Sequence, residues 1–226
     1  MGNKISKVDY GTLVSLNAKM YEAIAYAYKK RLLGDSARRK YITDESIVWN
    51  NNGMSVIQIQ CNEVGIANDV LRNNDWMITV VDGKIVEIYK ITTDPKTKRS
   101  GMAFIVPQIT RRHVGYHRWN LNRIALRQDQ GSDFDYTTWV RRFYYKNGKW
   151  TWTEQKGFYT IHTHDTGGFW NSSLGCAVIA NDSTYRNYFK PALKDLKARK
   201  LDRNIPLYII NYKEFIELAN ENFCLV

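Results

Sequence analysis

The sequence has few residues of the kinds that define several common classes of protein. It holds three cysteines and four prolines in 226 residues. Three cysteines are too few for the disulfide framework of a small secreted scaffold, and their odd number leaves at least one thiol outside any intramolecular disulfide. No run approaches the ~18 consecutive apolar residues that a membrane-spanning helix needs. The sequence therefore excludes a disulfide-rich scaffold and predicts no membrane span.

The sequence also lacks the features of an export signal. Lys4 and Lys7 resemble the basic start of a signal peptide, but polar residues interrupt the stretch that follows, at Asp9, Asn17 and Lys19. A signal peptide needs an apolar segment at that place. We therefore expect a protein that is made in the cytoplasm without a signal peptide.

Aromatic residues and positive charge are both abundant. Phe, Trp and Tyr make up 13% of the chain, which excludes a disordered protein, and 33 Lys and Arg against 22 Asp and Glu give a formal net charge of +11. Such an excess predicts a polyanionic partner: a nucleic acid, an anionic membrane or an acidic polymer such as a bacterial cell wall. Solubility alone is the other explanation. No helix-turn-helix, zinc-finger or RNA-recognition signature accompanies the basic residues, so the sequence does not favour nucleic-acid binding.

The pattern of apolar residues places helices near both ends of the chain and strands between them. The predicted helices span 12–33, 184–200 and 212–222. The predicted strands are 76–81, 84–93, 101–108, 158–164, 176–180 and 206–210, with hairpins over 46–60 and 139–152. Asp82-Gly83 and Asn147-Gly148 are dipeptides typical of tight hairpin turns. This arrangement predicts a single α+β or mostly β domain.

The residues that could carry chemistry gather in one segment, residues 158–179, with the sequence FYTIHTHDTGGFWNSSLGCAVI. In an extended strand alternate side chains share a face, so His162 and His164 point the same way. A loop rich in Gly, Asn and Ser follows and leads to Gly175 and Cys176, just before a second apolar strand. Such a loop can fold back and bring the cysteine beside the histidines.

Cys176 is the candidate nucleophile. A thiol reacts as its thiolate, and at an ordinary pKa near ~8.5 little thiolate forms at neutral pH, so a neighbouring imidazole must accept the proton. Gly175 would permit a tight turn whose backbone N–H groups face a developing oxyanion. Two other interpretations stay open, a buried structural cysteine and a zinc site. The zinc ligands would be His162, His164 and Cys176, completed by His113 or His117.

The same segment resembles the active-site signature of the L,D-transpeptidases, in which a strand histidine after Ile is followed by a loop and then Ser-x-Gly-Cys. The resemblance places the base at His162, the serine at Ser173, the glycine at Gly175 and the nucleophile at Cys176. Those enzymes usually carry Arg or Asn two positions after the cysteine, where this chain has Val178. Any substrate contact made by that side chain must therefore come from elsewhere.

A wider resemblance covers about residues 65–210. VVDGKIVEIYKITTDP and GMAFIVPQ look like successive strands of the transpeptidase catalytic domain. Gly115-Tyr116-His117 and Ala125-Leu126-Arg127-Gln128, with the His-to-Cys segment, are similar to small bacteriophage proteins that look like wall-degrading lysins of this family. The resemblance implies an L,D-transpeptidase-like β-sandwich or barrel-like sheet with peripheral helices. It implies a catalytic domain over 65–226, with a helical and hairpin region over 1–64 packed on the same domain.

The activity that the resemblance implies is acyl transfer on amide bonds of peptidoglycan stem peptides, without a metal or cofactor. Cys176 attacks the carbonyl, and His162 acts as base and then as acid. The residues expected near the substrate are His164, Ser173, Trp170, His117 and Arg127. Plainer interpretations are an exposed strand histidine for His164, a packing residue for Trp170, and a surface charge or a member of a buried ion pair for Arg127. The acceptor, water for a lysin-like peptidase or an amine for a transpeptidase, is not readable from the sequence.

Two alternatives to a wall enzyme remain at this stage. One is a catalytically inactive phage structural protein with the same fold, and the other is a basic nucleic-acid-binding protein. The missing signal peptide fits a phage lysin, which is made in a bacterial host and reaches the wall after release through the membrane by a separate pore-forming protein. The sequence does not indicate an oligomeric state.

Overall fold

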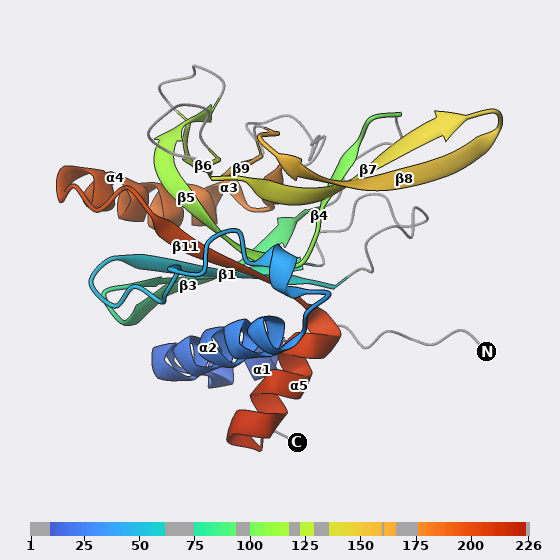
Figure 1. The fold of residues 1–226 in the computed structure, drawn as a ribbon. Helices are drawn as coiled ribbons and strands as arrows, with labels where there is room; N and C mark the ends of the chain where they lie inside the picture. Colours follow the sequence, from blue (N-terminus) through green and yellow to red (C-terminus); the bar gives the residue numbers. More distant parts are fainter. Residues whose placement is uncertain are drawn as a thin grey trace.

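A closed barrel of eight strands forms the centre of the protein (Figure 1). The computed structural model describes residues 10–61, 75–93, 100–117, 123–128, 136–159, 161–165 and 176–224. The barrel strands are β1 (Met54–Gln60), β2 (Asp75–Val81), β3 (Lys84–Thr92), β5 (Gln108–Tyr116), β6 (Ile124–Arg127), β9 (His162–Asp165), β10 (Ala177–Ile179) and β11 (Ile205–Asn211). They follow the order β1-β11-β5-β6-β9-β10-β3-β2, and β2 pairs back with β1. The pairs β1–β11 and β9–β10 are parallel.

A second sheet and several helices surround the barrel. The sheet has the order β4-β7-β8 and consists of β4 (Ala103–Ile105), β7 (Thr138–Lys146) and β8 (Lys149–Gly157). The helices are α1 (Tyr10–Ser15), α2 (Ala18–Gly34), the 3-10 turn η1 (Arg39–Tyr41), α3 (Asp182–Thr184), the π-helical turn η3 (Tyr185–Phe189), α4 (Lys190–Ala198) and α5 (Tyr212–Phe223). In Figure 1, β7 and β8 extend away from the barrel as a long arm. This architecture confirms the predicted mostly β, α+β fold with a barrel-like sheet.

Strand β1 shows how the sequence builds two apolar cores. All seven of its residues are buried, because both faces of the strand are covered. Ile57 and Ile59 belong to the core shared with α1, α2 and α5, which lie beneath the barrel in Figure 1. Met54 and Val56 belong to the core inside the barrel, to which α4 contributes leucines. The alternation of a strand thus sends every second side chain into a different core.

The two predicted tight hairpins are confirmed. Asp82 and Gly83 join β2 to β3 with φ values of 49° and 72°, and Asn147 and Gly148 join β7 to β8 with φ values of 49° and 75°. Two successive residues with positive φ are what a type I′ turn requires, and Asn, Asp and Gly adopt that conformation at the lowest cost.

Other expectations were wrong in part. Residues 46–60 do not form a hairpin: only 54–60 is a strand, and β1 pairs with the distant β11 and β2. The helix expected over 12–33 is two helices, because the side chain of Asn17 accepts a hydrogen bond from the N–H of Met20 and caps α2. The helix expected over 184–200 contains the π-helical turn η3. Strands β5 and β6 were not predicted. The proposed division near residue 65 stays a prediction, although β1 precedes it and is a barrel strand.

No helix in the described part of the chain is long and apolar enough to cross a membrane.

A buried amide joins the barrel to the second sheet. Gln108, at the start of β5, is completely buried, and Pro107 separates it from β4. Its side-chain Nε2 donates to the carbonyl oxygens of Val106 and Trp139, each at 2.8 Å, and its Oε1 accepts from the N–H of Trp139 at 2.8 Å. The side chain therefore replaces a missing backbone pair between β5 and β7.

We expect Gln108→Ala to lower the free energy of unfolding by about 2 kcal/mol, because it leaves the buried N–H of Trp139 unbonded and removes one of two hydrogen bonds to the Trp139 carbonyl, which also accepts from the N–H of Val106 at 3.2 Å. Urea unfolding followed by circular dichroism measures the change. The matched control is Gln155→Ala on β8, because among the described residues the Gln155 amide bonds the side-chain hydroxyls of Tyr144 and Thr153 and no backbone group. Equal destabilisation by the two substitutions would contradict the proposed joint.

Candidate active site

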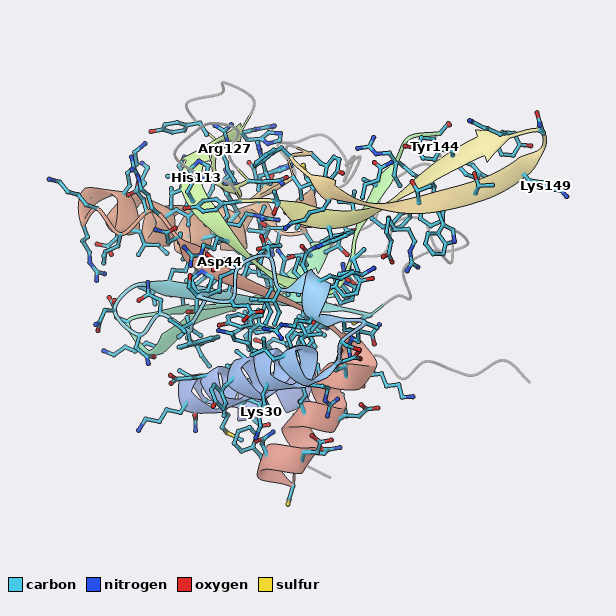
Figure 2. The ribbon with its side chains drawn as sticks, viewed as in Figure 1. Lys30, Asp44, His113, Arg127, Tyr144 and Lys149 are labelled. Carbon is cyan, nitrogen blue, oxygen red and sulfur yellow. The ribbon has the colours of Figure 1, made fainter. Side chains whose placement is uncertain are left out.

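A row of polar side chains crosses three neighbouring strands of the barrel. In the registered pairs, His113 of β5 lies opposite Arg127 of β6, and Arg127 lies opposite His162 of β9. Directly paired residues share one face of a sheet, so these three side chains point to the same side. Figure 2 shows His113 and Arg127 together at the barrel, away from the arm residues Tyr144 and Lys149.

The other two histidines join this row. His117 follows the end of β5, and its Nδ1 lies 2.8 Å from Nδ1 of His162. The ring of His117 stacks on that of His164, with centroids 3.9 Å apart and planes 28° apart. His164 is held by the contact of its Nδ1 with the carbonyl oxygen of Asp165. All four histidines of the protein therefore gather on β5, just after its end, and on β9, although the sequence separates them by up to 51 positions.

Cys176 lies directly beside His162. Strand β10 runs parallel to β9 with Ala177 opposite Thr163, so the preceding residue, Cys176, comes next to His162. The backbone N–H of His162 donates to Sγ of Cys176, with N and S 3.5 Å apart. The cysteine is partly exposed to solvent, whereas His162 is 1% exposed. The partly exposed thiol therefore lies at the backbone of the buried His162, and the pairing of Cys176 with the His162 ring in catalysis stays a prediction.

The contact between the rings of His117 and His162 restricts which ring nitrogens carry protons. Two Nδ1 atoms at 2.8 Å need one proton between them. If Nδ1 of His162 carries that proton, its Nε2 holds a lone pair. That Nε2 is buried and has no hydrogen-bond partner among the described residues. The arrangement can therefore leave His162 Nε2 as a proton acceptor on the side of the ring away from His117.

The electrostatic environment keeps His162 neutral. Burial, followed by the charges of His117, Arg127, His164 and Arg112, lowers the pKa of His162 to about 2. Cationic groups on β5, β6 and β9 thus disfavour a further proton on this ring. Asp165 brings a carboxylate to the histidines: its Oδ1 lies 4.0 Å from Nδ1 of His164. The same oxygen lies 3.7 Å from Nε of Arg123.

Gly115 makes room for the arginine in this row. A Cβ at this position would lie 2.5 Å from Cδ of Arg127 and 3.2 Å from Nε2 of His113. Any other residue would displace the Arg127 side chain that lies across the strand. The glycine between Val114 and Tyr116 is therefore part of the construction of the site.

Gln128 supports the site from behind. The side chain is buried; its Nε2 donates to the carbonyl oxygen of Gly157 at 2.6 Å, and its Oε1 accepts from the N–H groups of Tyr159 and Ile161. Gln128 directly follows Arg127 in the sequence, so these bonds tie the end of β6 to residues that precede β9. Gln128 therefore positions the histidine strand and does not face the cysteine.

The structure brings together five of the predicted site residues. Cys176, His162, His164, His117 and Arg127 lie at one place on the barrel. The other three, Gly175, Ser173 and Trp170, lie outside the described residues. Within the described ranges, no three His, Cys, Asp or Glu side chains are arranged to hold a metal ion, so the zinc interpretation gains no support there.

The sequence analysis did not foresee that His113 lies in this row, nor that the neighbouring Arg112 is buried. Arg112 is 1% exposed and is among the largest fully buried side chains. The signal that could have identified it is the alternation in QITRRHVGY, which places Thr110, Arg112 and Val114 on one face of a strand. That strand was not predicted, so the burial of Arg112 was not expected.

Comparisons with known proteins give little further information. No protein-family model matches the chain, and no curated protein sequence matches it. Among solved structures, L,D-transpeptidase 1 of Mycobacterium tuberculosis is similar, with 13% identity and a TM-score of 0.25. The alignment covers 70% of this chain and 62% of the mycobacterial chain, so it spans less than two thirds of that enzyme. A TM-score this low adds no argument to the geometry described above.

We expect His162 to make folding dependent on pH. Its pKa is about 2 in the folded protein and about 6.5 in the unfolded chain, so below about pH 6.5 the unfolded state binds the extra proton. Stability is therefore full at neutral pH and falls as the pH falls, by about 2 kcal/mol between pH 7 and pH 5 from this residue alone. Urea unfolding at several pH values measures the slope.

The comparison for this prediction is His162→Gln, which has no titrating group at that position. The difference between the unfolding free energies at pH 7 and pH 5 should shrink by the amount stated above. An unchanged pH dependence in the variant would show that His162 titrates normally in the folded protein.

Proposed function

We propose that this protein is a thiol-dependent enzyme that acts on amide bonds of peptidoglycan stem peptides, with Cys176 as nucleophile and His162 as base. The observation that carries the proposal is the contact of Cys176 Sγ with the backbone N–H of His162, at 3.5 Å, on a strand that also presents the His162 ring. A partly exposed thiol beside a buried imidazole is the arrangement that nucleophilic catalysis by cysteine requires.

His117 is the proposed third member of the group. It would accept the Nδ1 proton of His162, which directs the lone pair of Nε2 toward the reaction. In this role His117 orients the base and does not touch the substrate. An orienting partner of the base is the general feature of nucleophile–base pairs.

The proposed reaction has two acyl-transfer steps. The thiol proton passes to Nε2 of His162 while sulfur bonds to the amide carbonyl carbon, and the carbonyl oxygen becomes an oxyanion. As the C–N bond breaks, the proton on His162 passes to the leaving amine, and a thioester with Cys176 remains. Water or an amine then attacks the thioester, His162 accepts the proton of that nucleophile, and the thiol is restored. Hydrolysis would make the protein lysin-like, and aminolysis would make it a transpeptidase.

The substrate class rests on three considerations. The His-to-Cys segment resembles the transpeptidase signature, the net charge of +11 suits an anionic wall polymer, and the cationic groups around His162 suit the carboxylates of stem peptides. Arg127 and His164 are the described residues proposed to face the substrate. We further propose a phage-type lysin that reaches the wall from the host cytoplasm through a separate pore.

Incubation with defined muropeptides, followed by mass spectrometry, tests the function. We expect cleaved or exchanged stem peptides with the wild type and a loss of at least about 100-fold with Cys176→Ala or His162→Gln. Cys224→Ala is the matched control, because Cys224 is an exposed thiol at the end of α5. Absence of any product with the wild type would favour an inactive structural protein, and salt-dependent binding of DNA or RNA unaffected by Cys176→Ala would favour a nucleic-acid-binding protein.

A pair of substitutions tests the proposed role of His117. Asn places its Oδ1 near the position of the imidazole Nδ1, so His117→Asn keeps an acceptor for His162, whereas His117→Leu removes it. We expect kcat to fall roughly 100-fold in the Leu variant and much less in the Asn variant, with KM nearly unchanged in both. Equal losses in the two variants would contradict an orienting hydrogen bond.

A further inference from the structure

The hairpin of β7 and β8 carries exposed aromatic side chains on the arm that projects from the barrel (Figure 1). Tyr145, Trp150 and Trp152 are 53%, 38% and 51% exposed. Tyr145 lies opposite Trp150 in the strand register, and the centroids of these two rings are 5.2 Å apart. Directly paired residues share a face of a sheet, and so do alternate residues of a strand. The three side chains therefore form one ring patch on one face of the arm.

Other residues hold the hairpin together. Asn147 and Gly148 form its tight turn. Phe143 is 4% exposed and packs edge-on against Phe104 of β4, with ring centroids 5.0 Å apart. The ring patch lies further out on the same face and is left in solvent. Neighbouring large aromatic side chains in water are unfavourable, and an exposed cluster of this kind marks a binding surface.

The charges beside the ring patch partly neutralise one another. Glu154 lies opposite Arg141 on this face and accepts from its Nη2 at 3.1 Å. The same carboxylate accepts from Nζ of Lys40 at 3.3 Å and from the hydroxyl of Tyr41 at 2.7 Å. The guanidinium of Arg141 also lies over the Trp152 ring, 4.1 Å from its centroid. The cations nearest to the ring patch are thus already engaged with a carboxylate and a ring.

This pattern does not favour a nucleic acid. A single-stranded nucleic acid needs free cations along its phosphates beside the stacking rings. Strand alternation puts Lys146 and Lys149 on the opposite face of the arm. Lys156 is on the ring face, but it lies at the base of the arm, opposite Trp139. Phosphates that passed the ring patch would meet Glu154.

The tip of the arm does not favour a membrane. The arm extends away from the barrel, so its tip would enter a bilayer first (Figure 1). The tip has the sequence Lys146-Asn147-Gly148-Lys149, and charged and polar groups are costly to place among lipid tails. The ring patch therefore favours a partner with uncharged, apolar faces that remains in water.

The base of the arm is joined to the candidate active site. The carbonyl oxygen of Gly157, at the end of β8, accepts a hydrogen bond from Gln128, which directly follows Arg127. Trp152 precedes Gly157 by five residues, so about 17 Å of extended strand separates the ring patch from this joint. A long polymer can occupy the ring patch and the candidate active site together.

We infer that the ring patch binds the glycan strand of peptidoglycan. A sugar ring has C–H groups on its faces and hydroxyl and amide groups at its edge, so it packs on an aromatic side chain while its polar groups stay hydrated. A glycan strand repeats such rings and meets both Trp150 and Trp152, which are about 7 Å apart along β8. The inference rests on the proposed function in that the substrate is the wall polymer.

Sedimentation with purified peptidoglycan sacculi tests the inference in a Cys176→Ala background, which cannot carry out the proposed cleavage. About 0.5 M NaCl largely screens the attraction between exposed charges. We expect the background protein to bind, and Trp150→Ala combined with Trp152→Ala to weaken binding about 10-fold or more. Phe at both positions keeps a ring and should weaken binding less. The matched control is Tyr26→Ala, which should bind like the background, since Tyr26 is 72% exposed on α2.

Competition identifies the part of the wall that is bound. Glycan strands freed of their stem peptides should displace the background protein from the sacculi. Failure of these strands to compete would overturn the inference, as would a background protein that does not sediment, a result that requires no ring variant to fold. Equal binding by the double Ala variant, shown by circular dichroism to be folded, would also overturn it. So would ring-dependent binding of single-stranded DNA or anionic vesicles in place of sacculi.

The outcome is separate from that of the muropeptide experiment, because the background protein lacks the thiol. Ring-dependent binding to sacculi without turnover of muropeptides by the wild type would refute the proposed reaction and leave the ring patch as a glycan site. Turnover by the wild type without ring-dependent binding would refute the ring patch alone.

Discussion

The parallel pairing of β9 with β10 is the constraint on which the site depends. It places Ala177 opposite Thr163 and thereby brings Cys176 to the backbone N–H of His162, fourteen positions earlier in the chain. The barrel fixes both strands from outside, because β6 pairs with β9 and β3 pairs with β10. A shift of one residue in either strand would turn the histidine or the cysteine to the other face.

The same sheet concentrates positive charge around His162. Strand β6 carries Arg127 between His113 and His162, and Gly115 leaves the space that the arginine stem occupies. Such an assembly of cations is unfavourable by itself and becomes favourable when an anion is present. A thiolate, an oxyanion and a substrate carboxylate are the anions that the proposed reaction would bring to this place. Burial and this charge together lower the pKa of His162.

Local signals predicted the local parts of the fold. Asp82-Gly83 and Asn147-Gly148 fix their hairpins because positive φ at two successive residues selects these side chains. Long-range pairing was not accessible in this way. Residues 54–60 find their partners in β2 and in β11, about 150 positions away, and not in a hairpin over 46–60 (207 − 56 = 151 for one registered pair). Strand β5 was missed because its polar residues, among them Gln108 and Arg112, are buried inside the protein, where a sequence pattern leads one to expect apolar residues.

The sequence by itself determined that His162 and His164 share a strand face and that a glycine-rich excursion separates them from Cys176, because strand periodicity and turn chemistry are properties of neighbouring residues. Only the tertiary structure decided that His117 contacts His162 and that Arg112 points inward while Arg111 points outward. These placements depend on the order of strands around the barrel and on which face of β5 is covered. Both follow from the packing of segments far apart in the chain, since the identity of an arginine does not reveal what will surround it once the barrel has closed.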